Sequence, residues 1–217
     1  VIRDGTTGLE TLSKNTRNQV RKGLRNFQVE RIEPGELIHA GYGVYRRAMR
    51  SYRTDLATLT ESGFRANLDN CTGDDSVEFW GAWDADGKLV AYAQNRVQEG
   101  SCNFQIIKLD PSFTRMYSGY ALIHTMTDHY LGERGMRYVN DGARSIRHQT
   151  GIQDFLIRKF RFRKAYSLLR VAYAPGLQAA VNILFPARAL ASLLPSRFGT
   201  KVKALMFQEE IRRSCGE

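Results

Sequence analysis

The sequence predicts a mixed α/β domain built around a mostly antiparallel sheet. Three neighbouring segments, residues 77–83, 88–98 and 102–109, have strand-like composition and are separated by short turns, of which Asp86-Gly87 is typical of a hairpin. Segments with helical spacing of apolar residues stand before and after this meander. We therefore expect a central sheet with helices on both of its faces.

The composition is that of a folded protein with a basic surface. Of the 217 residues, 42% are apolar and 11% aromatic, which excludes a disordered chain. Lys and Arg (32) outnumber Asp and Glu (22), so the formal charge of +10 suits an anionic partner. Cys71, Cys102 and Cys215 are widely spaced, so they indicate neither a disulfide framework nor a zinc site, and we expect a cytoplasmic protein.

The chain divides near residue 175. We expect residues 1–174 to form the main domain and residues 175–217 a helical extension packed on it; a partner or a membrane surface is the alternative. Polar residues and Pro186 interrupt the longest apolar stretch, so we expect no insertion into a membrane. No signal peptide opens the chain, and it begins at Val1 without a Met, so we expect a fragment cut from a longer protein.

Residues 13–27 predict an amphipathic helix with a basic face. Arg17, Arg21 and Arg25 recur four apart, and five cations but no acid lie between Lys14 and Arg25. The apolar stripe consists of Leu12, Val20, Leu24 and Phe27. The basic face is either solvated or directed at an anion.

A short strand and two helices follow. Residues 29–32 alternate as a strand, and residues 36–52 have helical spacing. Thr58 followed by Glu61 is typical of a capping box, so a further helix is expected over residues 58–68.

Beyond the meander, helices and strands alternate. A polar loop over residues 110–118 leads into a helix at 119–133, which Gly135 ends. The next elements are a strand at 137–140, a helix at 152–160 and a long final strand at 162–173.

Several residues that carry chemistry in other proteins are better explained by packing here. Trp80 and Trp83 lie in a strand and favour a sheet face over a nucleobase platform. His124 and His129 are five apart without a metalloprotease pattern, so we expect no metal site. Cys102 has no sequence context that would activate its thiol.

This order of elements over residues 12–173 resembles the GNAT fold of acyl-coenzyme A dependent N-acyltransferases and of their relatives, the Fem-type aminoacyl transferases. The resemblance implies a sheet that splays between its fourth and fifth strands, here residues 102–109 and 137–140. A second likeness lies in residues 12–23, which are similar to the L-x-x-x-x-R-x-x-I-R-x-A segment of Fem-type proteins.

A loop motif carries the most specific likeness. GNAT enzymes have the pattern Q/R-x-x-G-x-G/A after the fourth strand, and Gly119 and Ala121 fill its small positions. Met116 stands where Gln or Arg is usual, with Arg115 one residue early. The resemblance implies that the donor, acetyl-CoA or another acyl-CoA, is bound by Ile107, Leu109, Arg115, Met116, Tyr117, Ser118, Gly119, Tyr120 and Ala121. Free N–H groups at a helix start suit a pyrophosphate on physical grounds as well.

The junction at residues 152–164 is also similar to that of these families, with two departures. Ile157 occupies the position of the usual Tyr or Lys, and Arg161 that of the usual Gly. Ile157 cannot donate a proton, so Tyr117 or Tyr138 is the candidate acid, unless the thiolate departs unassisted.

Acyl transfer also needs a base and a polarised carbonyl. The resemblance implies main-chain polarisation near Ile106 and Ile107. Glu78 and Asp141 are the candidate bases; otherwise Glu78 lies on a solvated strand face and Asp141 caps a turn.

The polar loop residues Arg144 and His148 are candidates for binding the acceptor. We expect an acyl-CoA dependent N-acyltransferase acting on an amine-bearing acceptor. The alternatives are a Fem-like transferase that uses aminoacyl-tRNA and a basic nucleic-acid-binding module without catalysis. The acceptor and the oligomeric state are left open.

Overall fold

The computed structural model describes residues 1–52, 57–142, 151–166, 171–174, 176–188 and 196–214. These residues belong to two compact units. The first unit contains the described residues up to Lys164, and the second contains those from Ala165 onward.

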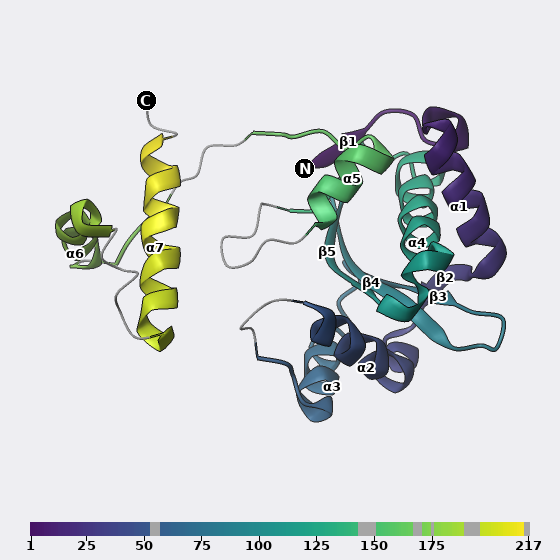
Figure 1. Cartoon of the computed structure of the whole chain (residues 1–217), viewed down its shortest axis with the longest axis horizontal. Coiled ribbons are helices and arrows are strands. Elements are labelled where there is room, and N and C mark those ends of the chain that lie inside the picture. Colours follow the sequence, from purple (N-terminus) through teal and green to yellow (C-terminus); the bar gives the residue numbers. More distant parts are fainter. Residues whose placement is uncertain (53–56, 143–150, 167–170, 175, 189–195, 215–217) are drawn as a thin grey trace. The chain divides into compact units, whose positions relative to one another are not determined.

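A mixed sheet with the order β1-β6-β5-β4-β3-β2 forms the centre of the first unit (Figure 1). Its strands are β1 (Ile2–Asp4), β2 (Gln28–Ile32), β3 (Val77–Trp83), β4 (Leu89–Gln98), β5 (Ser101–Leu109) and β6 (Tyr138–Asn140). All neighbours are antiparallel except β5 and β6, which are parallel. This confirms the predicted mostly antiparallel sheet and its central meander.

The parallel pair β5–β6 is short and opens into a fork. Pairing runs from Ser101 opposite Tyr138 to Asn103 opposite Asn140. Beyond Asn103, β5 continues to Leu109 without a partner from β6. The sequence analysis predicted a splay between residues 102–109 and 137–140, which are β5 and β6 of the structure, and this splay is confirmed.

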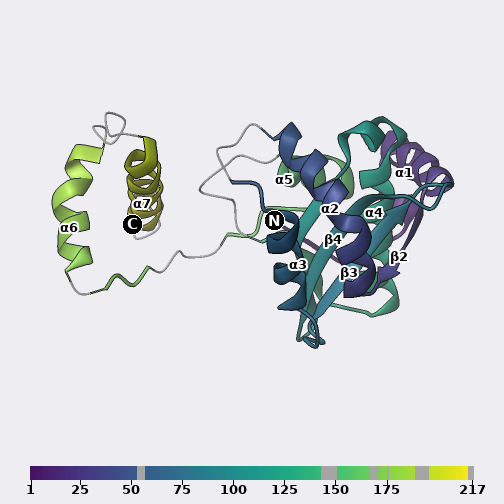
Figure 2. The same cartoon turned by 90° about the horizontal axis from the view of Figure 1, so that it is seen from below.

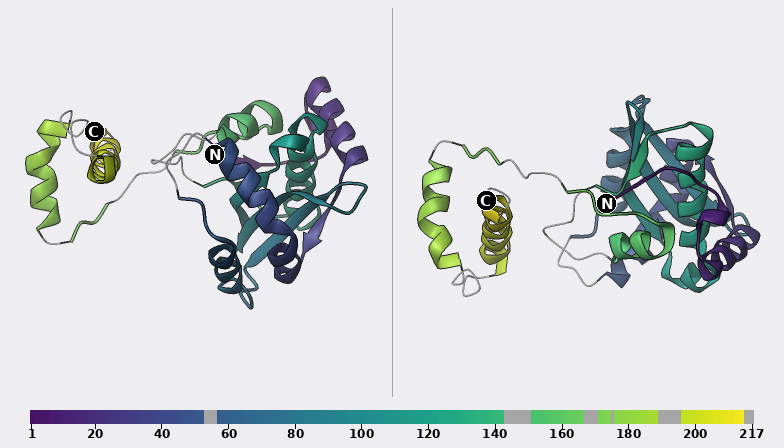
Figure 3. Two further views of the ribbon diagram at one scale, coloured as in Figure 1. Left: turned by 60° about the horizontal axis from the view of Figure 1, so that its bottom comes forward. Right: turned by 90° about the horizontal axis from the view of Figure 1, so that it is seen from above.

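Helices cover both faces of the sheet (Figures 1 and 2). On one face lie α1 (Lys14–Asn26) and α4 (Ser118–Thr127), packed against each other. The other face carries α2 (Pro34–Ser51) and α3 (Glu61–Asp69). The helix α5 (Ile152–Phe160) packs with the α1–α4 layer, and Figure 3 shows the two layers from further directions.

Strand alternation gives each layer its own hydrophobic core. Trp80 and Ala82 face the α1–α4 side, where they join Leu122 and Met126. Phe79, one residue earlier, faces the opposite side with the residues of α2 and α3. Both Trp80 and the partly buried Trp83 pack against these cores, as the sequence predicts.

The helices α1 and α3 both begin at a residue whose side chain caps the helix. The Ser13 hydroxyl accepts from the Thr16 N–H at 3.3 Å and caps α1, a cap that the sequence analysis did not name. For α3, the prediction of Thr58 as the cap is wrong. The cap is Thr60, whose hydroxyl accepts from the Gly63 N–H at 3.1 Å.

The predicted long strand over residues 162–173 is also wrong for the described residues. The helix α5 ends at Arg161, whose φ of 58° is left-handed, and the chain then makes only an isolated bridge between Arg163 and Ile2. The sheet edge beside β6 is already occupied by β1, a three-residue strand that the sequence analysis missed. A strand of that length carries too little alternation to be recognised.

The helix that follows β5 changes midway from α-helical to π-helical conformation. The predicted helix over residues 119–133 is α4, continued by a π-helical segment, η3 (Asp128–Glu133). A 3₁₀ segment, η2 (Pro111–Met116), precedes α4, and another, η1 (Leu9–Thr11), precedes α1. π-Helical turns are rare and often place functional or packed side chains.

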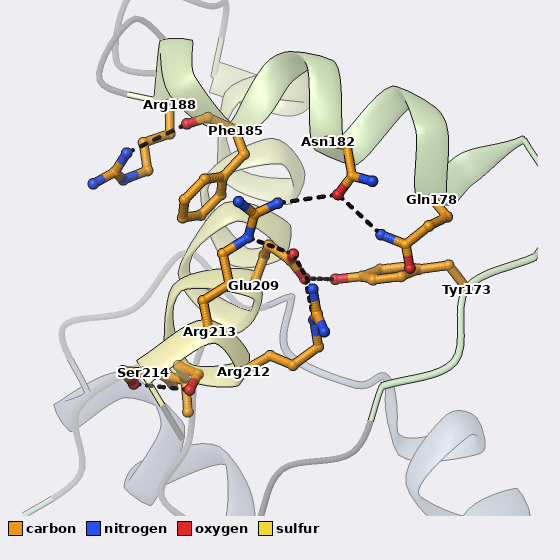
Figure 4. A network of polar contacts seen from close by, with 10 residues as sticks. Tyr173, Gln178, Asn182, Phe185, Arg188, Glu209, Arg212, Arg213 and Ser214 are labelled. Atoms are coloured by element: carbon orange, nitrogen blue, oxygen red, sulfur yellow. Dashed lines mark hydrogen bonds and ion pairs between the residues drawn. The ribbon is translucent and has the colours of Figure 1, made fainter. Parts of the chain in front are cut away.

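The second unit contains two helices, α6 (Leu177–Leu184) and α7 (Ser196–Ser214), and Arg213 on α7 donates to Oδ1 of Asn182 on α6 at 3.0 Å (Figure 4). The fully buried carboxylate of Glu209 accepts hydrogen bonds from Arg212, Arg213 and Tyr173. The bonds from Arg212, followed by those from Arg213 and Tyr173, hold the pKa of Glu209 well below its usual range. In the described part of the chain, no helix combines the length and apolarity needed to cross a membrane.

Candidate active site

The corner between β5 and α4 is held by a buried carboxylate. Asp110 accepts from the Ser112 N–H at 3.0 Å and thereby caps η2. Its other oxygen pairs with Nε of Arg47, on α2, at 2.5 Å. Burial raises the pKa of Asp110, but the Ser112 N–H and the Arg47 guanidinium outweigh it, so this pKa lies below its usual value. The corner is thus tied to the helix layer on the other face of the sheet.

The helix α4 begins without a side-chain cap. Tyr117 occupies the N-cap position with φ 70° and ψ 32°, a left-handed conformation that is uncommon for residues other than Gly. The Tyr117 carbonyl accepts from the N–H groups of Tyr120 and Ala121, both at 3.1 Å. Within the described residues, the N–H groups of Ser118 and Gly119 have no backbone partner. These amides give the corner a partial positive charge at the start of α4.

The predicted cofactor-binding residues come together at this corner. Met116 and Arg115 end η2 and are exposed, whereas Ser118 is buried and donates to the Phe113 carbonyl at 3.4 Å. Gly119 lies against β5, since a Cβ at this position would be 2.9 Å from Cδ1 of Leu109. Gly119 is buried like Ser118, and the atom that a Cβ there would meet is the end of the Leu109 side chain.

Two helices flank the corner closely. On α1, a Cβ at Gly23 would lie 2.5 Å from the Tyr117 carbonyl oxygen, so only glycine permits this approach. On α5, the ring of Phe155 meets that of Tyr120 edge-on, with centroids 4.9 Å apart. The start of α4 is therefore fixed from both sides.

The free part of β5 contains a bulge. Ile106 pairs with Gln94 and Phe104 with Asn95, which leaves Gln105 as an extra residue on β5. After the bulge, Ile107 and Leu109 face the α4 side, and Lys108 faces α2. The edge of residues 104–109 that looks into the fork has no strand partner among the described residues.

Asp141 follows the last residue of β6, at the end of the strand pair where the fork opens. Burial raises the pKa of this carboxyl to about 6, although Gln153 partly offsets the effect. A carboxylate with that pKa is ionised at neutral pH and remains basic enough to accept a proton. Asn140 pairs with Asn103, so Asp141 lies beside the start of the unpaired part of β5, and the β5–α4 corner follows at the other end of that part, after Leu109.

Glu78, the other candidate base, lies in a different environment. It is on β3, which β4 separates from the fork, and its carboxylate is buried. It accepts from the Tyr130 hydroxyl at 2.7 Å and from the Arg134 guanidinium at 2.6 Å. Trp80 and Asn95 donate in turn to the Tyr130 oxygen at 2.8 and 3.3 Å. This geometry favours a structural role and not the solvated strand face that its sequence pattern also allowed.

The remaining candidates are the two tyrosines proposed as the acid and the two loop residues proposed to bind the acceptor. Tyr117 borders α1, whereas Tyr138 lies on β6 between Asp4 and Ser101. Arg144 and His148 lie outside the described residues.

The described residues contain no group of three His, Cys, Asp or Glu side chains able to hold a metal ion. Burial raises the pKa of the Cys102 thiol to about 12, which opposes a nucleophilic role for this cysteine.

Two polar residues of β5 were missed by the sequence analysis. Asn103 is the last residue of β5 that pairs with β6, and its Oδ1 is buried without a hydrogen-bond donor among the described residues. Lys108 faces α2, with Nζ 4.7 Å from the ring centroid of Tyr52, and burial lowers its pKa. The available signal was a polar residue among the apolar residues of a strand, but the surroundings of both residues come from other elements.

No protein-family model and no curated protein sequence matches this chain. Among solved structures, FemX superposes with a TM-score of 0.52 at 13% identity, covering 68% of this chain and 53% of FemX. The ribosomal-protein-S18-alanine N-acetyltransferase from Escherichia coli is 22% identical with a TM-score of 0.40, covering 51% of this chain and 62% of that one. The chain thus spans between half and two thirds of the length of these proteins. At such identities the likeness concerns the fold.

Proposed function

We propose that this chain, which has a GNAT-like fold, is an N-acyltransferase that moves an acyl group from an acyl-CoA thioester to an amine. The observation that carries the proposal is the uncapped start of α4 beside the fork between β5 and β6. The first feature suits a pyrophosphate, and the second leaves an unpaired main-chain edge next to it.

The corner fits the diphosphate of such a donor. The N–H groups of Ser118 and Gly119 have no backbone partner in the described chain, and Gly119 has no side chain to block the approach. Arg115, at the end of η2, adds an exposed guanidinium. The bound thioester supplies the activated acyl group.

The fork then provides groups for the transfer itself. Main-chain N–H groups near Ile106 and Ile107 polarise the acyl carbonyl. The amine nitrogen attacks that carbonyl, the C–N bond forms as the C–S bond breaks, and the carboxylate of Asp141 takes the proton released by the amine. The departing thiolate is protonated by Tyr117, by Tyr138 or by water.

A ligand screen tests the proposed donor. A donor present at 100 times its Kd stabilises the folded chain by about 2.7 kcal/mol, which a thermal shift detects. We expect such a shift with acetyl-CoA or a longer acyl-CoA, and release of free thiol when an accepted amine is added. Absence of any shift with millimolar acyl-CoA would contradict the proposal.

A Fem-like transferase that uses aminoacyl-tRNA is the second candidate. The structural likeness to FemX and the basic face of α1 favour it. Binding of tRNA to such a face weakens steeply with salt, because bound counterions are released. A shift with charged tRNA and none with acyl-CoA would select this candidate.

A further inference from the structure

A basic depression adjoins the start of α4 on the side of α1. It has a volume of about 330 Å³. It is lined by Asn15, Asn18, Gln19, Arg21, Lys22, Arg25 and Tyr117. All of these residues except Tyr117 belong to α1, and Tyr117 is the N-cap residue of α4. The depression therefore adjoins Tyr117, the residue that precedes the amides to which the diphosphate is assigned.

The cations of this depression lack acidic partners. Arg21, Lys22 and Arg25 form no salt bridge within the described residues, and all three are exposed. Arginines on other elements of the same unit do pair, as Arg47 does with Asp110 and Arg134 with Glu78. Arg21 and Arg25 also repel each other, because they are four apart on one helix. A bound anion would relieve this repulsion.

The position of the depression relative to the corner is fixed by packing. The close approach of Gly23 to the Tyr117 carbonyl joins α1 to the first turn of α4. Nδ2 of Asn26 donates to the Met116 carbonyl at 3.1 Å, and Nζ of Lys22 lies 6.0 Å from the ring centroid of Tyr117. These contacts hold the helix α1, which carries the cations, against the residues that precede α4.

We propose that this depression binds a second phosphate group of the donor, separate from the diphosphate at the start of α4. The inference rests on the proposed function, because it assigns the donor's first phosphates to that helix start. Guanidinium and ammonium groups bind phosphate through charge-assisted hydrogen bonds, and Asn15 and Asn18 add neutral donors. The second phosphate is either the ribose 3′-phosphate of coenzyme A or a phosphodiester of an RNA donor.

The test compares coenzyme A with dephospho-coenzyme A, which lacks only the 3′-phosphate. The variant R21Q/K22Q/R25Q removes three exposed charges, and R46Q/R50Q/R65Q removes three exposed charges from α2 and α3 as a matched control. Binding of both nucleotides and of an uncharged tRNA is measured by calorimetry at two salt concentrations. Circular dichroism verifies that both variants fold.

We expect the α1 variant to lose about 10-fold or more in affinity for coenzyme A and to keep its affinity for dephospho-coenzyme A. The control variant keeps both affinities. The wild type could bind tRNA and not coenzyme A. If the α1 variant then binds tRNA more weakly and its binding depends less on salt, the second phosphate is a phosphodiester of RNA.

Three results overturn the inference alone. They are an unchanged affinity of the α1 variant for coenzyme A, an equal loss of its affinity for both nucleotides, and an equal loss of coenzyme A affinity in the control variant. Failure of the wild-type chain to bind any of the three ligands overturns the proposed function as well. The two failures are therefore distinguishable.

Discussion

At the scale of single residues, two carboxylates occupy opposite kinds of environment. Asp141 lies at the base of the fork, directly after the last β5–β6 pair, and burial raises its pKa to about 6. Glu78 is held by Tyr130 and Arg134 on a strand remote from the fork. The first can exchange a proton near neutral pH, and the second serves as the centre of a buried network.

Replacement of Asp141 tests its role as the base. We expect Asp141→Asn to reduce kcat by about 100-fold or more, because general base catalysis is lost. In the wild type the rate should rise with pH through about 6, as the carboxyl of Asp141 ionises. Steady-state kinetics between pH 5 and 8 measure both effects. A variant with the wild-type rate and pH profile would remove Asp141 from the mechanism.

The same pKa has a consequence for stability. The folded chain binds a proton at Asp141 more tightly than the unfolded chain does, so the stabilisation is complete below the unfolded pKa and is lost as the pH rises through about 6. A shift from 3.8 to about 6 corresponds to about 2–3 kcal/mol. We expect Asp141→Asn to be more stable than the wild type at pH 8, as measured by urea denaturation. Equal stability of the two proteins at pH 8 would contradict the raised pKa.

The network at Glu78 makes a different prediction. Glu78→Gln should destabilise the fold by about 1–3 kcal/mol, because Arg134 loses its buried charge partner. The exposed Glu99→Gln is the control and should unfold like the wild type. Denaturant curves measure stability. Activity per folded molecule then separates a structural role of Glu78 from a role as the catalytic base. Loss of activity in a fully folded Glu78→Gln would restore this residue as the base.

At the scale of elements, the contact between α1 and α4 determines the geometry of the corner to which we assign the donor. Gly23 allows the two helices to approach until a Cβ would collide with the Tyr117 carbonyl. That carbonyl is a backbone atom and cannot turn aside as a side chain can. The conformation of Tyr117, and with it the direction of the free amides, therefore depends on this single position.

Enlarging Gly23 tests this dependence. We expect Gly23→Val to destabilise the chain by about 1–3 kcal/mol through overpacking and to weaken donor binding. Gly35→Ala is the matched control on α2, because a Cβ there meets nothing within 4 Å. Thermal unfolding with and without acyl-CoA measures both quantities. Unchanged stability of Gly23→Val would show that α1 can move away freely.

At the scale of the whole molecule, the first unit contains complete cores of its own. Both hydrophobic clusters draw all their residues from the first unit. The second unit has a separate polar centre at Glu209. We therefore propose that residues 1–164 fold and bind donor independently of residues 165–217.

A truncated chain tests this organisation. A protein ending at Lys164 should unfold cooperatively, with a midpoint within about 4 °C of the full chain and with the same donor affinity. Calorimetry measures both. An insoluble or non-cooperative product would show that the C-terminal helices complete the fold.

Local patterns were sufficient to predict much of this fold. The meander from β3 to β5, the basic helix α1 and the glycine-containing start of α4 follow from alternation, helical spacing and turn residues. These are properties of neighbouring residues along the chain. They also led the sequence analysis to residues 115–121 as the donor corner.

Long-range contacts decided the rest. The strand β1 takes the edge of β6, so residues after Phe162 cannot form the predicted long strand there. Two features join positions far apart in the sequence: the close fit of Gly23 against Tyr117 and the network around Glu78. Burial of the Asn103 Oδ1, which has no donor among the described residues, also depends on the folded chain. Local residue preferences fix which segments become helices and strands. Which carboxylate becomes basic, and which helix borders the donor, depends on burial and distance after the chain has folded.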